Sequence, residues 1–330
     1  MLALVQANYI LDRCRAAFPQ LQFEIGAFKT TGDKLQGAAL IESGKSLPKG
    51  LFTKELEHAL LDGDADLAVH SLKDLPTDLP DGLKLTATPE RADVRDVLIL
   101  SPRSSRRESA PSSSPAAQGA PGGESRLTSA ATISGLPRGA TVATSSTRRK
   151  MQLLALRPDL NIVEIRGNVG TRLSKVAEPE KLHATILAAA GLARLGYRVT
   201  DDGRLEGRDV PAGLRAAFLP LDEMLPAPGQ AALGLETRVN DPRIEEICAA
   251  LNHEATFQSV TAEREFLHAM GGGCLAPIAA HAQVRGGEVS LRAVWFPDAT
   301  ARPIEGRASA SGAADLGRRL ALELKRRTAA

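Results

Sequence analysis

The pattern of hydrophobic and polar positions predicts helices and short strands that alternate along most of the chain. Apolar residues near helical spacing predict an amphipathic helix over residues 2–18. The alternating residues that follow predict a strand over 21–29. A helix over 51–61 precedes a short apolar strand, 65–69, which runs into the polar sequence His-Ser-Leu-Lys-Asp. This order is typical of an α/β fold with a parallel or mixed sheet.

A second series of strands and helices begins after residue 135, and the last section has a different pattern. Strands over 141–143 and 161–165 flank a helix over 147–156. From residue 256 onward two helices enclose two adjacent strands, which predicts a small α+β domain. The predicted segments are a first lobe (1–100), an insertion (101–135), an arginine-rich second lobe (136–225), a return to the first lobe (226–250) and the α+β domain (251–330).

The composition changes abruptly between Ser101 and Ala131. Of these 31 residues, 22 are Ser, Pro, Gly or Ala, and large apolar side chains are nearly absent. Such a segment buries too little surface to offset its ordering entropy. We therefore predict a disordered insertion without a chemical role.

Composition also excludes several classes of protein. Hydrophobic residues make up 43% and charged residues 24%, as in ordinary globular proteins. There is no apolar run of the roughly 18 residues that a membrane helix needs, and no basic, cleavable leader at the N-terminus. The three cysteines form no Cys-x-x-Cys pair, which argues against disulfides and a zinc site. We expect a cytoplasmic protein with no membrane partner and no metal.

The charge is concentrated in one part of the chain, although the net charge is only +2. Between Leu136 and Lys175 there are eight basic residues, against the two acidic residues Asp159 and Glu164. Arginine binds carboxylate or phosphate groups through paired hydrogen bonds, so this excess of basic residues predicts an anionic ligand. Nucleic acid is one candidate, but aromatic residues, which stack on bases, are only 3% of the chain. We therefore expect no nucleic acid partner.

Polar residues follow the first buried strand where it ends. Ser71, Lys73 and Asp74 lie there, and ligands of α/β sheets bind beyond the carboxyl ends of strands. The alternative is a solvated turn in which Asp74 caps a helix.

Two further strand ends have the same character. Ser145, Ser146 or Thr147 can cap the following helix, whose positive end favours an anion. Arg148 and Arg149 in its first turn are unfavourable for the helix dipole, which implies a compensating anion; the alternative is a capped helix with exposed arginines. The third strand end carries Arg166, with Arg172 one to two helical turns further on.

The three cysteines differ in their surroundings. Cys248 and Cys14 fall on apolar helix stripes and are predicted to be core residues. Cys274 follows three glycines and belongs to no stripe. It is either an accessible thiol or a residue that fills a small gap in a turn.

Five motifs in order resemble the porphobilinogen deaminase family, also called hydroxymethylbilane synthases. The motifs are Ala68-Val-His-Ser-Leu-Lys-Asp-Leu-Pro76, Thr144-Ser-Ser-Thr-Arg-Arg149, Ile165-Arg-Gly-Asn-Val-Gly-Thr-Arg-Leu173, Leu225-Pro-Ala-Pro-Gly-Gln230 and Gly271-Gly-Gly-Cys274. The resemblance covers nearly all of the chain outside the insertion. It implies a transferase of tetrapyrrole (haem, chlorophyll or corrin) biosynthesis that joins four porphobilinogen molecules into linear hydroxymethylbilane and releases ammonia.

The resemblance also implies a covalent dipyrromethane cofactor and assigns the site residues. Cys274 matches the cysteine that holds the cofactor through a thioether, and Asp74 matches the catalytic aspartate. The implied cofactor contacts are Ser71, Lys73, Ser145, Ser146, Arg148 and Arg149. The implied substrate contacts are Arg166, Arg172, Arg194 and Gln230.

The fold that the resemblance implies has two lobes like those of periplasmic binding proteins and a small C-terminal α+β domain that bears the cofactor. We expect a monomer. Family members usually begin with a strand that ends in a Thr-Arg-x-Ser-Pro-like motif, and this sequence starts at Met1-Leu-Ala-Leu, just after that point. The first strand and two active-site residues are therefore expected to be missing. Either the start codon is misassigned, or the chain is an inactive or weakened homologue that binds anions, which is the alternative to the enzyme.

Overall fold

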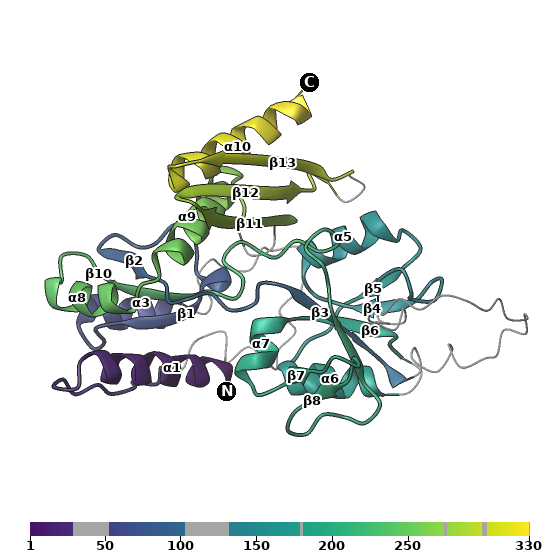
Figure 1. The fold of residues 1–330 in the computed structure, drawn as a ribbon, viewed down its shortest axis with the longest axis horizontal. Helices are drawn as coiled ribbons and strands as arrows, with labels where there is room; N and C mark the ends of the chain where they lie inside the picture. The colour runs from purple at the N-terminus through teal and green to yellow at the C-terminus, as the bar shows by residue number, and fades with distance from the viewer. Residues whose placement is uncertain (29–52, 103–131, 179–180, 274–275, 299–301, 330) are drawn as a thin grey trace, which may run out of the picture. The chain divides into compact units, whose positions relative to one another are not determined.

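The computed structural model describes residues 1–28, 53–102, 132–178, 181–273, 276–298 and 302–329, which are coloured in Figure 1. Their contacts divide the chain into two compact units, Met1–Val94 with Leu225–Ala330, and Arg95–Met224. Most of the predicted insertion, and Cys274, lie outside the described residues. Within the described part, no helix is long and apolar enough to cross a membrane.

The first unit contains an antiparallel three-stranded sheet built from two distant parts of the chain. Its strands are β1 (Ala68–Ser71), β2 (Leu83–Ala87) and β10 (Leu233–Arg238), in the order β1-β10-β2. β10 follows the whole second unit in sequence, yet it is the central strand. The chain therefore returns to the first unit at Leu225 to complete this sheet.

Helices cover both faces of that sheet. On one face, α1 (Leu2–Ala17) and α8 (Pro242–Leu251) bring Cys14 and Cys248 into one apolar cluster with β10. On the other face, α3 (Lys54–Asp62) packs Leu60 against the sheet. The predicted core positions of both cysteines are thus confirmed. Burial raises the pKa of Cys14 and raises that of Cys248 to about 12, which disfavours the nucleophilic thiolate form of both.

The strand predicted over residues 21–29 is wrong as far as the structure describes it. Residues 21–28 contain no strand, and residue 29 lies outside the described part. Phe23 packs against the apolar cluster of α1 and α8, whereas Leu21 and Ile25 are exposed. An alternating sequence forms a strand only where a neighbouring strand pairs with its backbone.

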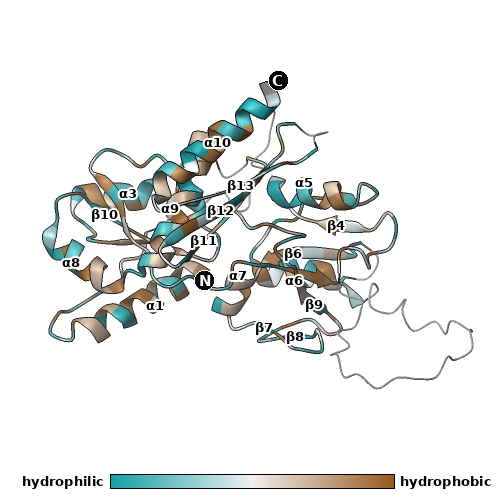
Figure 2. Cartoon of the chain, turned by 45° about the horizontal axis from the view of Figure 1, so that its top comes forward, coloured by the Kyte–Doolittle hydropathy of each residue, from teal (hydrophilic) through white to brown (hydrophobic). Residues whose placement is uncertain are grey.

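The C-terminal part of the first unit has its own sheet and core. Strands β11 (Ile278–Arg285), β12 (Glu288–Trp295) and β13 (Ile304–Ala310) form an antiparallel meander. Helices α9 (Glu254–Ala269) and α10 (Ala313–Ala329) pack against the sheet and against each other. Figure 2 shows both hydrophilic and hydrophobic residues along α10, as expected for an amphipathic helix.

Gly317 permits the close contact between α9 and α10. A Cβ atom at this position would lie 2.3 Å from the carbonyl oxygen of Ala262 and 2.7 Å from the amide nitrogen of Phe266. Both atoms belong to the backbone of α9, so they cannot move without displacing the helix. The two helices therefore approach as closely as they do because residue 317 has no side chain.

A buried carboxylate connects this C-terminal part to the rest of the first unit. Glu263 of α9 is completely buried and forms two hydrogen bonds with the guanidinium of Arg91, at 2.7 and 2.8 Å. It also accepts hydrogen bonds from the backbone amides of Gly229 and Ala282. Arg91 in turn donates to the carbonyl oxygen of Gln230. One side chain thus joins four segments that are distant in sequence.

The second unit is a five-stranded mixed sheet. Its order is β5-β4-β6-β3-β9, with β4, β5 and β6 parallel and β3 antiparallel to both of its neighbours. The bounds are β3 (Asp96–Leu100), β4 (Thr141–Ala143), β5 (Asn161–Val163), β6 (Ala184–Ala188) and β9 (Arg215–Phe218). A separate two-stranded ladder joins β7 (Arg198–Val199) to β8 (Leu205–Glu206).

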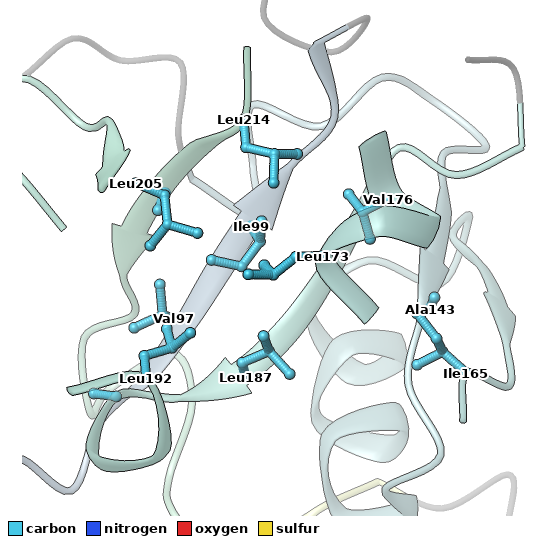
Figure 3. Close-up of a cluster of buried hydrophobic side chains, with 12 residues drawn as sticks. Val97, Ile99, Ala143, Ile165, Leu173, Val176, Leu187, Leu192, Leu205 and Leu214 are labelled. Carbon is cyan, nitrogen blue, oxygen red and sulfur yellow. The ribbon is translucent and has the colours of Figure 1, made fainter. Parts of the chain in front are cut away.

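Helices cover both faces of this sheet as well, which accounts for the continuous apolar sequence of β3. Val97 and Ile99 face the cluster that α6 (Val169–Ala177) and α7 (Ala189–Arg194) cover, drawn in Figure 3. Leu98 and Leu100 face the cluster under α5 (Thr147–Leu156). The predicted first lobe ended at residue 100, but β3 lies in the second unit because both of its ladder partners, β6 and β9, are there. The α/β fold class with a small C-terminal α+β part is confirmed.

We predict that Gly317→Ala destabilises the C-terminal part by about 2 kcal/mol, because the added methyl group overlaps the α9 backbone. Trp295 in β12 is the single tryptophan of the chain, so its fluorescence during urea unfolding measures this effect. Gly312→Ala is the matched control, since Gly312 directly precedes α10 and a Cβ there meets nothing within 4 Å. An unchanged midpoint for Gly317→Ala would contradict the close contact.

We predict that Glu263→Gln lowers the stability of the first unit by about 3 kcal/mol, because it leaves the buried Arg91 guanidinium without its countercharge. The same fluorescence measurement tests it. Glu265→Gln on the same helix is the control, since Glu265 lies 3.7 Å from the more exposed Arg318. Equal midpoints for the two variants would rule out a structural role for the Glu263 carboxylate.

Candidate active site

The carboxyl ends of β4, β5 and β6 lie at one edge of the second sheet, because the three strands are parallel and adjacent. Each strand is followed by a helix, α5, α6 or α7. Ligands of α/β sheets bind at such an edge. Most of the basic and hydroxyl residues singled out from the sequence follow these strand ends.

Ser145 and Ser146 organise the loop between β4 and α5. The Ser145 hydroxyl donates to the carbonyl oxygen of Ile165 at 2.7 Å and accepts from its amide at 3.2 Å, which ties this loop to the one after β5. The Ser146 hydroxyl accepts from the Arg149 amide and so caps α5, as predicted. Both hydroxyls lie at the candidate edge.

Arg148 and Arg149 are buried, contrary to the alternative of a capped helix with exposed arginines. Arg149 donates to both carboxylate oxygens of Asp96, at 3.2 Å from Nε and 2.7 Å from Nη2, and to the carbonyl oxygen of Ile186 at 2.9 Å. Arg148 donates to the same carboxylate at 2.9 Å. Asp96 thus provides the countercharge that the sequence implied without identifying its source.

The charge state of Asp96 depends on both its burial and its two arginine partners. Burial alone would raise the pKa of Asp96, but the charges and hydrogen bonds of Arg148 and Arg149 hold it well below its usual range. The cluster therefore stabilises the folded unit above the pKa of an unfolded aspartate, about 3.9. That contribution is lost as the pH falls toward the lower pKa of the folded state. Burial also lowers the pKa of Arg148, against the opposing effect of Asp96.

The other predicted arginines of this unit differ in exposure. Arg172 of α6 is half-buried, donates to the carbonyl oxygen of Gly167 at 2.8 Å, and has a pKa lowered by burial and by the charge of Arg149. Arg172 therefore belongs to the same electrostatic cluster as Arg149. Arg166 is exposed, 3.6 Å from Glu164, and Arg194 is half-buried at the end of α7.

In the first unit, β1 leads into a single 3-10 turn, Leu72–Asp74. Leu72 is buried and anchors the turn, while the Asp74 side chain is exposed and that of Lys73 is half-buried. Ser71 forms hydrogen bonds with the amide group of Gln6 on α1, at 2.8 and 3.1 Å. Gln6 is a site neighbour that the sequence did not indicate, although it is a polar residue on the apolar side of its helix.

The segment around Gln230 supports that turn. A Cβ atom on Gly229, whose φ is +72°, would lie 3.3 Å from the Lys73 amide nitrogen, so the two backbones are in close contact. The Leu72 amide donates to the carbonyl oxygen of Ala232. The Gln230 side chain is buried and donates to the carbonyl oxygen of Val94 at 2.7 Å. The segment that carries Gln230 is thus in contact with the turn that carries Lys73 and Asp74.

Cys274 lies outside the described residues, but the segments on either side of it are defined. α9 ends at Ala269, and β11 begins at Ile278. The Ala276 amide donates to the carbonyl oxygen of Gly273 at 2.9 Å. Among the described residues, no group of three or more His, Cys, Asp or Glu side chains could hold a metal ion.

Comparisons with known proteins match nearly the whole chain to one protein family. The family model described as porphobilinogen deaminase, dipyromethane cofactor binding domain, matches residues 1–246. The model of the porphobilinogen deaminase C-terminal domain matches residues 257–326. Among solved structures, a YaeC-family lipoprotein from Enterococcus faecalis covers 76% of this chain and 88% of its own, with 12% identity and a TM-score of 0.34, which is too low to support any conclusion.

Individual curated proteins named porphobilinogen deaminase are also similar to this chain in sequence. The relative from Geobacter sulfurreducens is 42% identical over 290 residues, 88% of this chain and 77% of its own. That from Clostridioides difficile is 38% identical over 294 residues, with shares of 89% and 83%. That from Thermus thermophilus is 41% identical over 283 residues, with shares of 86% and 77%. The chain belongs to the porphobilinogen deaminase family.

Proposed function

We propose that the protein is a porphobilinogen deaminase, which joins four porphobilinogen molecules head to tail into linear hydroxymethylbilane and releases one ammonia at each addition. The observation that carries this proposal is the match of both family domains over residues 1–246 and 257–326. The buried arginine cluster at the edge of the second sheet supports it, because the substrate is an anion.

The arginines account for recognition of the substrate. Each porphobilinogen carries an acetate and a propionate, so every addition brings about two negative charges at neutral pH. Guanidinium groups bind carboxylates through paired, charge-assisted hydrogen bonds. In the second unit, Arg166, Arg172 and Arg194 are the proposed contacts of substrate carboxylates; in the first unit, the proposed contact is the Gln230 amide.

The donor set also fits the dipyrromethane cofactor, which carries the same acetate and propionate groups. Arg148 and Arg149 offer cationic N–H donors at a site with the hydroxyls of Ser145 and Ser146. In the first unit, Ser71 and Lys73 are the proposed contacts, and Cys274 forms the thioether. When bound, the cofactor supplies the pyrrole carbon at which the chain of substrate units begins.

Asp74 is the proposed catalytic residue. Loss of ammonia breaks the carbon–nitrogen bond of the substrate side chain and leaves a positive charge delocalised over the pyrrole ring. A carboxylate beside the ring stabilises this cation. After the new carbon–carbon bond forms, the same carboxylate accepts the proton that leaves the bonded pyrrole carbon. The 3-10 turn anchored by Leu72 holds the Asp74 backbone for both tasks.

The alternative of a non-catalytic, anion-binding homologue is favoured by no observation of the described residues. A cytoplasmic location and a monomeric state remain part of the proposal, as does the absence of a nucleic acid partner. The low aromatic content, 3% of the chain, supports the last point.

Mass spectrometry of the intact, purified protein tests the function. We expect the mass of two pyrrole units above that of the sequence, located on Cys274 by peptide mapping, and release of ammonia from added porphobilinogen. Cys274→Ser should lack both, whereas Cys248→Ser, at a buried core position, should retain both. A wild-type chain with neither the added mass nor ammonia release would reject the proposal in favour of the anion-binding homologue.

We predict that Asp74→Asn lowers turnover about 100-fold or more, because the amide neither carries the negative charge nor accepts the proton. The pyrrole mass on Cys274 should remain, which separates a loss of chemistry from a loss of cofactor. Asp78→Asn, at an exposed residue of the same loop, is the control. Turnover of Asp74→Asn within about twofold of wild type would reject the assignment, since an essential acid–base group contributes much more.

A further inference from the structure

Asp96 is a charged residue at the start of a strand that is otherwise apolar, and no local sequence pattern explains it. It opens β3, whose other residues are all apolar and buried, and its own side chain is completely buried. A buried carboxylate is costly unless cations and hydrogen bonds compensate it. Here Arg148 and Arg149 do so, and both belong to the motif that follows β4.

The geometry fixes the plane of Arg149. Its Nε and Nη2 groups both donate to Asp96, in the paired arrangement in which guanidinium and carboxylate lie in one plane. Its Nη1 group donates to the carbonyl oxygen of Ile186 on β6, the strand next to β3. Two neighbouring strands therefore hold the guanidinium.

The support of Asp96 is rigid as well. Its backbone is in register with Ala188 of β6, and its carbonyl oxygen accepts a hydrogen bond from the Leu219 amide. The preceding residue, Arg95, stacks on the ring of Phe218 with its guanidinium carbon 4.2 Å from the centroid. Asp96 is thus fixed to the central part of the sheet and not to a loop.

Without Asp96, Arg148 and Arg149 would bring two like charges into a buried region that Arg172 also influences. Repulsion would favour other rotamers that point toward water. An arginine that must be ordered when its ligand binds loses considerable rotamer entropy at that step. Arginines already ordered by Asp96 avoid that loss, so their placement favours binding of an anion.

We propose that Asp96 is a positioning residue, which holds Arg148 and Arg149 in one arrangement for the carboxylates of the pyrrole units. Its role in assembling the cofactor rests on the proposed function, but its hold on the two arginines does not. The two parts can be tested separately.

The first test measures the arginines directly and needs no enzymatic activity. Full-length chain is produced in cells that make no porphobilinogen, so that no cofactor protects the site. The chain is treated with phenylglyoxal, which modifies accessible arginines, and the sites are mapped by mass spectrometry. Arg138, which is exposed, serves as the internal reference.

We expect Arg148 and Arg149 to be protected in the wild type and to react about tenfold faster in Asp96→Asn, as for loss of a hydrogen bond to a charged group. Asp159→Asn is the matched control. Asp159 holds Arg157 in the same paired manner, at 2.7 and 2.8 Å, but at the surface of the same unit. Continued protection of both arginines in Asp96→Asn would overturn the proposal.

The second test follows cofactor assembly. Cofactor-free chain is incubated with porphobilinogen, and the rate at which the mass of two pyrrole units appears is measured. We expect this rate to fall about tenfold or more in Asp96→Asn and to stay at the wild-type value in Asp159→Asn. A folded Asp96→Asn chain that assembles its cofactor at the wild-type rate would show that Asp96 is merely structural.

If Asp96→Asn does not fold, the rate of cofactor assembly is measured in Asp96→Glu instead. This variant retains the charge and moves the carboxylate by one methylene group, so the chain should fold with the arginines displaced. We expect a slower assembly rate together with an unfolding midpoint close to wild type. Wild-type rates in this folded variant would overturn the proposal. Absence of the pyrrole mass from the wild type itself would instead reject the proposed function, and the phenylglyoxal result would still decide whether Asp96 holds the arginines.

Discussion

Two arginine side chains cannot be buried side by side without an anion to compensate them, and in the second unit that anion is Asp96. The resulting cluster links the fold to the site. β3 carries Asp96 and is the strand that pairs with β6 and β9, while α5 carries both arginines across the end of β4. The same interaction therefore joins the sheet to the helix that covers it and orders the two arginines that we propose as carboxylate contacts.

The first unit also contains a buried carboxylate paired with an arginine, but this pair supports a turn. Glu263 compensates the buried Arg91 and also accepts from the amides of Gly229 and Ala282. It thereby fixes the segment that supports the 3-10 turn of Asp74. In each unit a buried carboxylate and an arginine meet from distant parts of the chain. The proposed catalytic and binding residues therefore depend on polar contacts that form only when the unit is complete.

Much of the organisation was predictable because it depends on near neighbours in sequence. Apolar periodicity predicted α1 and α8 and placed Cys14 and Cys248 in the core. The change from apolar strand to hydroxyl and basic residues predicted a candidate binding edge, and it placed α5 at Thr147–Leu156 as observed. The predicted strand over 21–29 failed because periodicity describes one strand, and a strand exists only with a partner.

The sequence by itself determined most of the local elements, the arginine-rich segment and the motifs that identify the family, since each element or motif depends on near neighbours in sequence. Only the tertiary structure decided which carboxylate meets which arginine. Asp96 lies 52 and 53 positions from its two arginines, and Arg91 lies 172 positions from Glu263. Tertiary structure also decided that β3 belongs to the second unit and that β10 is the central strand of the first sheet. Pairings over such distances form through the packing of whole sheets and helices, and no local pattern encodes them.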